Sequence, residues 1–345
     1  MPPEPSPPRY LGVEINRRCN LRCPHCFTAS GPEEHPGPPA ERVVELLGRF
    51  AALGVRHAGF SGGEPLLRTD LEDILAAGLE GGLTGYGLVT NGWAVTPRRA
   101  RSLREVGVKV VQVSLDGVDA ADHDAVRGCG PAGYYRALSA MRCFRDVGIR
   151  VDAAVLLNPR NLERLPELAL LGEALGLTTL RFCSFVPTGR ARDPALAAAL
   201  APAPERLDAF FALLRELNRR PTAPLRITID HGLGPWNDEG SFACSAGQGV
   251  AYVSSEGDLY PCPGLIFPAF RVGNVWGDRP LEELLRDPRM HAVRARDRRR
   301  DQGPCATCSN AGCSGGCRGL SFALTGDVAE SPPYCNVRRV GRPLR

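Results

Sequence analysis

The chain has 345 residues, of which 43% are hydrophobic and 23% are charged, and its formal net charge is +4. No run approaches the roughly 18 apolar residues of a membrane span, and the N-terminal MPPEPSPPRY lacks the apolar core of a signal peptide. We therefore expect a cytoplasmic globular protein whose residues 1–9 form a disordered tail. The weak net charge gives no reason to expect a nucleic acid or a membrane as partner, and the basic run at 294–300 is typical of a solvated helix face.

Residues 10–187 alternate apolar runs of strand length with amphipathic stretches of helical periodicity. The strand-like runs are 10–15, 55–61, 85–90, 108–115, 151–157 and 178–186, and the helical stretches are 41–54, 70–82, 97–107, 134–148 and 161–176. Strands separated by helices predict right-handed crossovers and a parallel sheet. Six such units are too few for a closed eight-stranded barrel, so we predict an α/β fold with a partial (β/α)6 TIM-like barrel over residues 10–190.

Two further segments follow the predicted barrel. Residues 191–224 are expected to form a helical connector that ends in the linker PTAP, and residues 225–340 a small α+β extension rich in Cys and Gly. The extension contains a strand-like run, a hairpin over 251–262 with Gly257 at its turn, and a short helix over 280–288. Its apolar core is too small to fold alone, so we expect bound metal to hold it together.

The unusual residues of the predicted barrel follow its strands. They are Cys19 after the first strand, FSGGEP (60–65) after the second, TNG (90–92) after the third, SLDG (114–117) after the fourth and VPTGR (186–190) after the sixth. The carboxyl ends of parallel barrel strands share one rim, which is where active sites of such barrels lie. The sequence therefore predicts a single site on that rim.

Thirteen Cys residues in a cytoplasmic chain indicate metal ligands before disulfides. Cys19, Cys23 and Cys26 are spaced C-x3-C-x2-C. Thiolates suit iron–sulfur clusters, and three of them can hold three irons of a [4Fe–4S] cluster while the fourth iron stays open. The alternative is a zinc site with a fourth ligand from elsewhere, for example His25 or His35.

The cysteine triplet after the first strand, followed by SGGEP after the second, resembles the radical S-adenosylmethionine (SAM) superfamily. This resemblance implies that the open iron is chelated by SAM. One-electron reduction of the cluster would then cleave SAM to methionine and a 5′-deoxyadenosyl radical, which abstracts hydrogen from a substrate. The protein would supply orientation and exclude water. The resemblance also implies an electron donor of the flavodoxin or ferredoxin type.

The resemblance assigns roles to individual residues on the predicted rim. Cys19, Cys23 and Cys26 would hold the SAM cluster. Gly62, Gly63 and Glu64 would meet the amino group of SAM, and Thr90 and Asn91 would line the same cavity. Ser114 and Asp116 would contact the ribose, and the backbone from Val186 to Thr188 would contact the adenine. For SLDG and TNG, ordinary polar strand ends and turns remain an alternative.

The C-terminal cysteines resemble the SPASM extension, which binds two auxiliary [4Fe–4S] clusters. Gly257 precedes Cys262 in a G-x4-C pattern, and the later block reads C-x2-C-x4-C-x3-C, one residue shorter than the usual pattern. The family's arrangement would give the outer cluster Cys305, Cys308, Cys313 and Cys335, and the inner one Cys244, Cys262 and Cys317. With three Cys, the inner cluster has either an open iron or a fourth ligand that is not Cys. For the later Cys block, the alternative interpretation is a zinc ribbon with four thiolate ligands.

Cys183, at the end of the sixth strand, is a candidate hydrogen donor to a substrate radical, although a buried free Cys is the simpler interpretation. We expect the substrate to be a peptide or protein side chain, which is crosslinked, epimerised or oxidised. The alternative is a small molecule such as a sugar, an aminocyclitol or a nucleoside. A non-catalytic iron–sulfur protein is the remaining alternative, and Glu64 with the SAM rim argues against it.

Overall fold

The computed structural model describes residues 7–219, 225–230, 244–297, 305–308, 313, 315–331 and 334–335. The first six residues of the predicted tail and the PTAP linker at 221–224 lie outside this described part. So does the end of the basic run at 294–300, of which the structure describes only the backbone of 294–297.

A ten-stranded sheet runs in the order β10-β9-β8-β1-β2-β3-β4-β5-β6-β7. The strands from β8 through β1 to β7 pair in parallel, and β9 and β10 pair in antiparallel fashion at one edge. Their bounds are β1 Tyr10–Glu14, β2 His57–Ser61, β3 Gly85–Thr90, β4 Val108–Ser114, β5 Arg150–Leu156, β6 Thr179–Cys183, β7 Arg226–Ile229, β8 Val250–Val253, β9 Asp258–Tyr260 and β10 Gly273–Asn274. The six predicted barrel strands are confirmed, and β7 and β8 extend the parallel sheet on either side.

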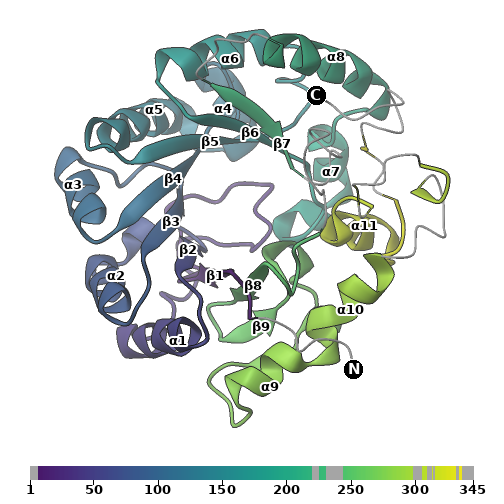
Figure 1. Cartoon of the computed structure of the whole chain (residues 1–345). Coiled ribbons are helices and arrows are strands. Elements are labelled where there is room, and N and C mark those ends of the chain that lie inside the picture. The colour runs from purple at the N-terminus through teal and green to yellow at the C-terminus, as the bar shows by residue number, and fades with distance from the viewer. Residues whose placement is uncertain are drawn as a thin grey trace.

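Helices surround the curved sheet (Figure 1). They are α1 Ala40–Ala52, α2 Leu71–Glu80, α3 Pro97–Glu105, α4 Ala120–Arg127, α5 Gly130–Asp146, α6 Leu165–Ala174, α7 Pro194–Leu200, α8 Leu207–Asn218, α9 Leu281–Arg286, α10 Pro288–Asp297 and α11 Arg318–Thr325. The five helices predicted between the barrel strands are present, and the predicted connector forms α7 and α8. Helix α4 was not predicted, and it supplies residues to the candidate site.

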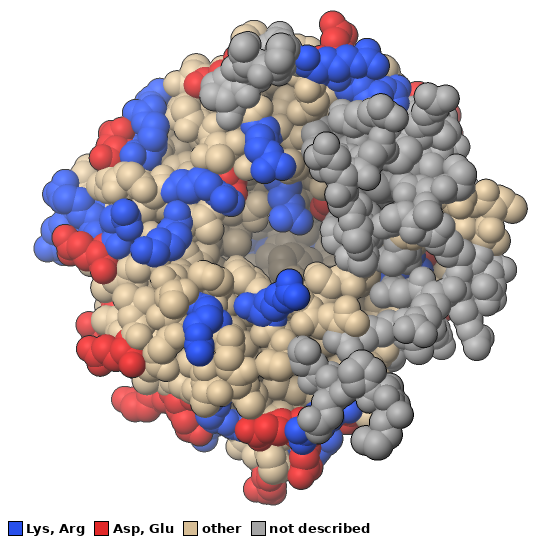
Figure 2. Space-filling model, viewed as in Figure 1, with Lys and Arg blue, Asp and Glu red and all other residues tan. Residues whose placement is uncertain are grey.

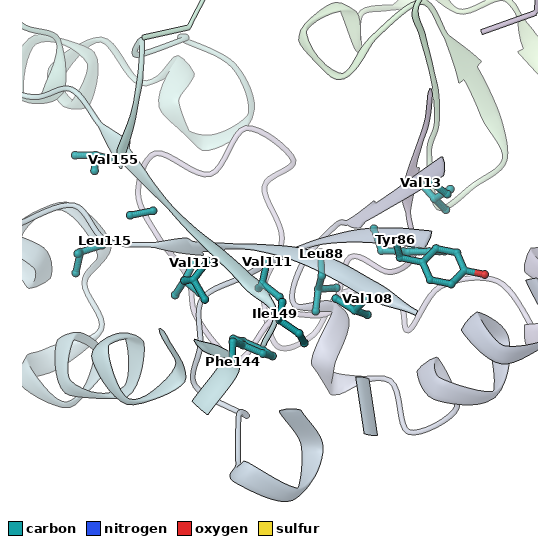
Figure 3. Close-up of a cluster of buried hydrophobic side chains, with 14 of the residues drawn as sticks. Val13, Tyr86, Leu88, Val108, Val111, Val113, Leu115, Phe144, Ile149 and Val155 are labelled. Atoms are coloured by element: carbon teal, nitrogen blue, oxygen red, sulfur yellow. The ribbon is translucent and has the colours of Figure 1, made fainter. Parts of the chain in front are cut away.

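One core fills the space between the outer face of the sheet and the helices. Alternate residues of the strands, such as Val111 and Val113 of β4, point at apolar side chains such as Phe144 of α5 (Figure 3). All three side chains are fully buried. The strict alternation of a strand explains this layer, because every second residue faces the helices.

The inner face of the first strands carries small residues. The Tyr10 ring lies across Gly59 of β2, where a Cβ would come within 1.7 Å of its hydroxyl oxygen, and reaches Gly87 of β3. Gly12 faces Tyr252 of β8, with a Cβ position 2.9 Å from the ring. In the view of Figure 2 the surface is hollowed over the middle of the barrel, and Lys and Arg side chains lie around the hollow. These glycines therefore make room for the Tyr10 and Tyr252 rings on the inner face of the sheet.

The C-terminal extension is joined to the barrel by the sheet itself. The predicted hairpin is formed by β8 and β9, with Gly257 in its turn at a φ of 86°. Strand β8 pairs in parallel with β1, so the extension lies directly beside the first barrel strand. A second small core of this part contains Tyr252, Tyr260, Leu265 and Phe270. Within the described residues, no helix has the length and apolar character needed to cross a membrane.

The Phe210 ring of α8 fixes the connector against the sheet. Phe210 is fully buried and packs edge-on against Phe182 of β6, with 5.2 Å between ring centroids. We expect Phe210→Ala to lower the unfolding free energy by about 3 to 5 kcal/mol, because truncation of a buried Phe leaves a cavity. Anaerobic thermal unfolding measures the effect, with Leu170→Ala as the control, since Leu170 of α6 is 59% exposed. Equal effects of the two substitutions would contradict this packing.

Candidate functional site at the carboxyl ends of the strands

The segment between β1 and α1 carries Cys19, Cys23 and Cys26 and crosses the space enclosed by the strands in the view of Figure 1. Cys19 and Cys23 are buried and Cys26 is half-buried. The chain turns tightly between the last two, because the backbone N–H of Cys26 donates to the carbonyl of Cys23 at 3.2 Å. The three predicted cluster ligands therefore share one irregular loop at the rim, here called the cysteine loop (residues 15–39).

Arg190, after β6, holds this loop from the opposite side of the barrel. Its Nε and Nη2 donate to the Cys23 carbonyl at 3.0 and 2.8 Å, and its Nη1 donates to the Ser30 carbonyl at 2.7 Å. Its backbone N–H donates to the Cys26 carbonyl at 3.1 Å. The planar guanidinium presents several donors at fixed angles, so one side chain fixes two turns of the loop. The VPTGR segment was expected on the rim, but no role was predicted for Arg190.

Gly62 and Gly63, after β2, are in backbone contact with the cysteine loop. The N–H of Gly63 donates to the Asn16 carbonyl at 2.8 Å, and the N–H of Glu64 donates to the Arg18 carbonyl at 2.9 Å. A Cβ on Gly63 would lie 2.1 Å from the Arg18 carbonyl oxygen, and Gly62 has a φ of 137°. Both positions require glycine, one for close backbone approach and the other for its conformation.

The Glu64 side chain joins the ends of β2 and β3. Its fully buried carboxylate accepts hydrogen bonds from the Leu66 N–H at 3.0 Å, the Thr90 hydroxyl at 2.8 Å and the Asn91 N–H at 2.8 Å. Burial raises the pKa of Glu64, and these three donors oppose that rise. The Asn91 amide in turn donates to Asn20 at 2.9 Å and lies 3.8 Å from the Cys19 sulfur. The structure thus brings the predicted residues Glu64, Thr90 and Asn91 together beside Cys19.

The end of β4 contains a buried ion pair. Asp116 is fully buried, and its carboxylate accepts from Arg127 Nε at 2.5 Å and from the Leu156 N–H at 2.6 Å. Burial by itself would raise the pKa of Asp116, but the Arg127 guanidinium lowers it below the ordinary value. The Asp116 N–H donates to Nδ1 of His123 at 3.2 Å, and burial lowers the pKa of His123 to about 4, so the ring is neutral at pH 7. Ser114, the other predicted ribose contact, is buried at the same strand end.

Arg127 also faces the cysteine loop, with Nη1 3.9 Å from the Cys23 sulfur. Neither Arg127 nor His123 was singled out in the sequence, because the helix that carries them, α4, was not predicted. A usable signal was present, since His123 and Arg127 are four residues apart and lie in the segment after SLDG. That spacing places two side chains on one face of a helix, and here both face Asp116.

The last part of the rim follows β6. The N–H of Thr188 donates to the Val186 carbonyl at 2.8 Å, which makes a tight turn of the predicted adenine-binding segment. Cys183, at the end of β6, is half-buried, and burial raises the pKa of its thiol to about 12, so the thiol is protonated at pH 7. The next residue, Ser184, donates through its N–H and hydroxyl to Asp230 after β7, at 2.7 and 2.9 Å. Because Cys183 is the last residue of β6, it lies at the carboxyl ends of the strands, on the same rim as the cysteine loop.

In the C-terminal extension, Cys262 and Cys317 both lie close to Gly264. A Cβ at Gly264 would be 3.7 Å from the Cys262 sulfur and 4.0 Å from the Cys317 sulfur. Burial raises the pKa of both thiols, and the charge of Cys244 adds to the rise in each case. The three cysteines predicted for the inner auxiliary cluster are therefore neighbours in space.

Three of the cysteines predicted for the outer cluster, Cys305, Cys308 and Cys313, take part in hydrogen bonds. The N–H of Cys308 donates to the Cys305 carbonyl at 3.3 Å, and the N–H of Cys305 donates to the Ser331 hydroxyl at 3.3 Å. Cys313 accepts from the Gly315 N–H at 3.3 Å, and Cys335 is buried. Residues 298–304 and 309–312, which flank the first three of these cysteines, lie outside the described part of the chain.

The donor set of the cysteine loop fits an iron–sulfur cluster, since it consists of sulfur atoms that each have a neighbouring N–H or O–H group. The neighbouring groups are the Leu21 N–H at 3.4 Å for Cys19, the Arg127 guanidinium for Cys23 and the Thr28 hydroxyl at 3.4 Å for Cys26. Such hydrogen bonds to sulfur are one of the ways in which proteins tune iron–sulfur clusters.

The histidines of the zinc alternative have other partners. His35 contacts Glu256 through Nε2 at 3.1 Å, and its Nδ1 accepts from the Gly37 N–H at 3.2 Å. His25 contacts the Val126 carbonyl through Nδ1 at 3.1 Å. Among the described residues, no three His, Cys, Asp or Glu side chains are arranged around a position for a single metal ion.

A buried carboxyl group connects the cysteine loop to the C-terminal extension. Glu14, at the end of β1, is 3% exposed and accepts from the Tyr252 hydroxyl of β8 at 3.4 Å. Arg17 lies 3.8 Å from Glu14 and donates to Glu256 of the β8–β9 turn at 3.3 Å. Burial raises the pKa of Glu14 to about 7, the Glu256 carboxylate adds to this rise, and Arg17 opposes it.

The raised pKa of Glu14 predicts that the unfolding free energy depends on pH. The folded state keeps the proton up to about pH 7 whereas the unfolded chain loses it near 4.5. The contribution to stability is therefore full below the unfolded pKa and is lost as the pH rises through the folded one. Relative to Glu14→Gln, the wild-type protein should lose about 2 to 3 kcal/mol of unfolding free energy between about pH 5 and about pH 8.

Anaerobic unfolding of both proteins across this pH range measures the difference. Glu45→Gln, which alters an exposed carboxylate of α1, serves as the control. A pH-independent difference between wild type and Glu14→Gln would show that Glu14 does not change its protonation on unfolding.

Comparison with known families and proteins gives consistent matches over the chain. Residues 13–172 match the radical SAM superfamily, and residues 244–309 match SPASM, an iron–sulfur cluster-binding domain. The AdoMet-dependent heme synthase of Methanosarcina barkeri is 29% identical over 96% of this chain and 97% of its own length. The mycofactocin maturase MftC of Mycolicibacterium smegmatis is 30% identical over 95% of this chain and 82% of its own length.

A solved structure of native anSMEcpe with bound AdoMet and the Cp18Cys peptide superimposes with a TM-score of 0.74. It is 20% identical and covers 95% of this chain and 94% of that one. At this identity the likeness concerns the fold, and it confirms the predicted partial barrel with a C-terminal extension.

Proposed function

Since this chain belongs to the radical SAM superfamily and is a radical SAM enzyme with a SPASM extension, we propose that its substrate is an amino-acid side chain of a peptide. Support comes from the similarity to the PqqA peptide cyclase of Granulibacter bethesdensis, which is 27% identical over 95% of this chain, and from the fold shared with an enzyme whose structure holds a bound peptide. The similarity to the peptide cyclase covers 87% of that protein's length, and it is the observation on which the proposal depends most.

We assign the SAM cluster to Cys19, Cys23 and Cys26. When bound and reduced by a flavodoxin- or ferredoxin-type donor, the cluster and SAM supply a 5′-deoxyadenosyl radical that abstracts hydrogen from the substrate. The backbone of the cysteine loop and the Arg190 side chain hold the three thiols at the rim. Metal binding requires the thiolate forms, so loading the site releases protons.

The remaining rim residues are assigned to SAM itself. The backbone of Gly62 and Gly63 is proposed to meet the amino group, because carbonyl oxygens suit an ammonium ion and no side chain intervenes. The Glu64 carboxylate already accepts three donors from the chain, so its part is to hold the edge on which these carbonyls lie. Thr90 and Asn91 line the same cavity beside Glu64.

Ser114 and Asp116 are the proposed ribose contacts, and the backbone from Val186 to Thr188 is the proposed adenine contact. Asp116 is paired with Arg127 and fully buried, so the Ser114 hydroxyl is the more accessible of the two ribose contacts. Cys183 on the same rim is retained as a candidate hydrogen donor, since its protonated thiol carries a transferable hydrogen atom.

Two auxiliary [4Fe–4S] clusters are proposed for the extension. Cys244, Cys262 and Cys317 would hold the inner one, and their proximity supports this set. Cys305, Cys308, Cys313 and Cys335 would hold the outer one. Together with the SAM cluster this gives three clusters in the loaded protein.

The cluster assignment predicts iron content and SAM cleavage. Reconstituted wild-type protein should hold about twelve iron atoms, four for each cluster. Replacing Cys19, Cys23 and Cys26 together with Ala should lower this to about eight and abolish 5′-deoxyadenosine, measured by chromatography after dithionite reduction. Cys143→Ala, in helix α5, is the control. Retained SAM cleavage in the triple variant would refute the site, and about four irons in the wild type would refute the auxiliary clusters.

A heme precursor is the second candidate substrate, because the heme synthase of Methanosarcina barkeri matches this chain over almost its whole length. The substrate would then be a small molecule, as in the alternative considered from the sequence, but a porphyrin and not a sugar, an aminocyclitol or a nucleoside. Either substrate would occupy the same rim beside the cysteine loop, since both reactions begin with hydrogen abstraction.

Deuterium transfer separates the two candidate substrates. The loaded enzyme is incubated with SAM and either a deuterated peptide encoded by a short reading frame beside the gene, or a deuterated iron porphyrin. We expect deuterium in 5′-deoxyadenosine and a mass change of the product only with the peptide. Transfer from the porphyrin instead would establish the second candidate, and the triple Cys variant controls for background in both assays.

A further inference from the structure

Cys23 differs from the other two thiols of the cysteine loop in the charge of its neighbour. The donors near Cys19 and Cys26 are a backbone N–H, an amide and a hydroxyl, all of them neutral. The donor near Cys23 is the Arg127 guanidinium, whose Nη1 is 3.9 Å from the sulfur. One corner of the thiol triplet therefore has a full positive charge beside it.

The position of this charge is determined by the fold. Arg127 is the last residue of α4, its side chain is 12% exposed, and its Nε is 2.5 Å from the fully buried Asp116. The Asp116 carboxylate is itself held by the Leu156 N–H of β5 at 2.6 Å. Two strand ends and a helix end thus hold the guanidinium against Cys23, so it is not a mobile surface side chain.

Asp116 only partly offsets the charge at the sulfur. The guanidinium reaches the Cys23 sulfur through Nη1, whereas the Asp116 carboxylate accepts from Arg127 Nε and from the Leu156 N–H. Charges in a buried site are weakly screened by solvent and salt. A neutral pair whose positive end is nearer to the thiol still produces a positive potential there.

We propose that Arg127 is a positioning residue that raises the reduction potential of the SAM cluster through Cys23, with Asp116 as its counter-charge. The inference rests on the assignment of Cys19, Cys23 and Cys26 to that cluster. Reduction adds one electron from the external donor to the cluster, forms and breaks no covalent bond, and makes the cluster more negative. A fixed positive charge stabilises the more negative state, and hydrogen bonds to ligand sulfur act in the same direction.

The proposal predicts shifts of opposite sign for the two partners. In the loaded enzyme, Arg127→Met should lower the potential, because it removes the positive charge and leaves the carboxylate. Asp116→Asn should raise the potential, because it leaves the guanidinium uncompensated. Arg127→Lys, which keeps the charge, should fall between Arg127→Met and wild type. We expect Arg127→Met to change the one-electron reduction equilibrium at least about tenfold, which corresponds to about 59 mV.

An anaerobic redox titration followed by electron paramagnetic resonance measures these potentials. The signal of the SAM cluster is recognised among those of the auxiliary clusters by its change on addition of SAM. Arg145→Met is the matched control, because it removes an equal charge from the exposed surface of α5, where Arg145 pairs with Asp146, and should leave the potential unchanged.

Shifts of the same sign in Arg127→Met and Asp116→Asn, or no shift in either, would overturn the proposal, since a purely structural role has no reason to reverse sign. If Arg127→Met fails to assemble the cluster, Asp116→Asn and Arg127→Lys decide the question. The triple Cys variant separates the two claims. A SAM-responsive signal that persists in it refutes the cluster assignment, whereas a signal that is lost in it but insensitive to Arg127 refutes only the present inference.

Discussion

The structure of the site depends on the hydrogen bonds that hold the cysteine loop to the strand ends around it. The loop lies between β1 and α1, and its buried carbonyls need donors from elsewhere in the chain. Gly63 and Glu64 supply backbone N–H groups from the end of β2, and Arg190 supplies three guanidinium hydrogen bonds from the segment after β6. Because these donors come from opposite sides of the barrel, the thiols keep their places only when the sheet is formed.

Two buried carboxylates at the same rim accept hydrogen bonds from backbone N–H groups. Glu64 accepts from the Leu66 N–H in the short 3-10 helix that follows it and from the Asn91 N–H after β3, and Asp116 accepts from the Leu156 N–H at the end of β5. Burial of a carboxylate is costly unless hydrogen bonds or an opposite charge accompany it. At Glu64 hydrogen bonds fill this role, and at Asp116 the Arg127 guanidinium does. The second arrangement brings a positive charge to Cys23, so the ion pair that stabilises the rim also sets the electrostatics at one thiol of the cysteine loop.

The C-terminal extension contacts the start of the cysteine loop because its strand β8 pairs with β1. Strand β8 lies beside β1, so Tyr252 and the β8–β9 turn reach Glu14 and Arg17 at the start of the cysteine loop. On the other side, β7 brings Asp230 to Ser184, next to Cys183. Strands β8 and β7, which follow the connector in the chain, thus pair with the first and the last of the six barrel strands.

The sequence by itself determined the strand and helix alternation, the cysteine loop, the glycine pair at 62 and 63 and the rim on which they meet. These features are local, because periodicity and close spacing act within a few residues, and the family resemblance depends on them. Sequence reasoning could not find that Glu64 and Asp116 are occupied by chain donors, or that Arg127 and Arg190 approach Cys23 from residues more than one hundred positions away. Those contacts were decided by the tertiary structure, since they depend on which strand ends become neighbours and how deeply each side chain is buried.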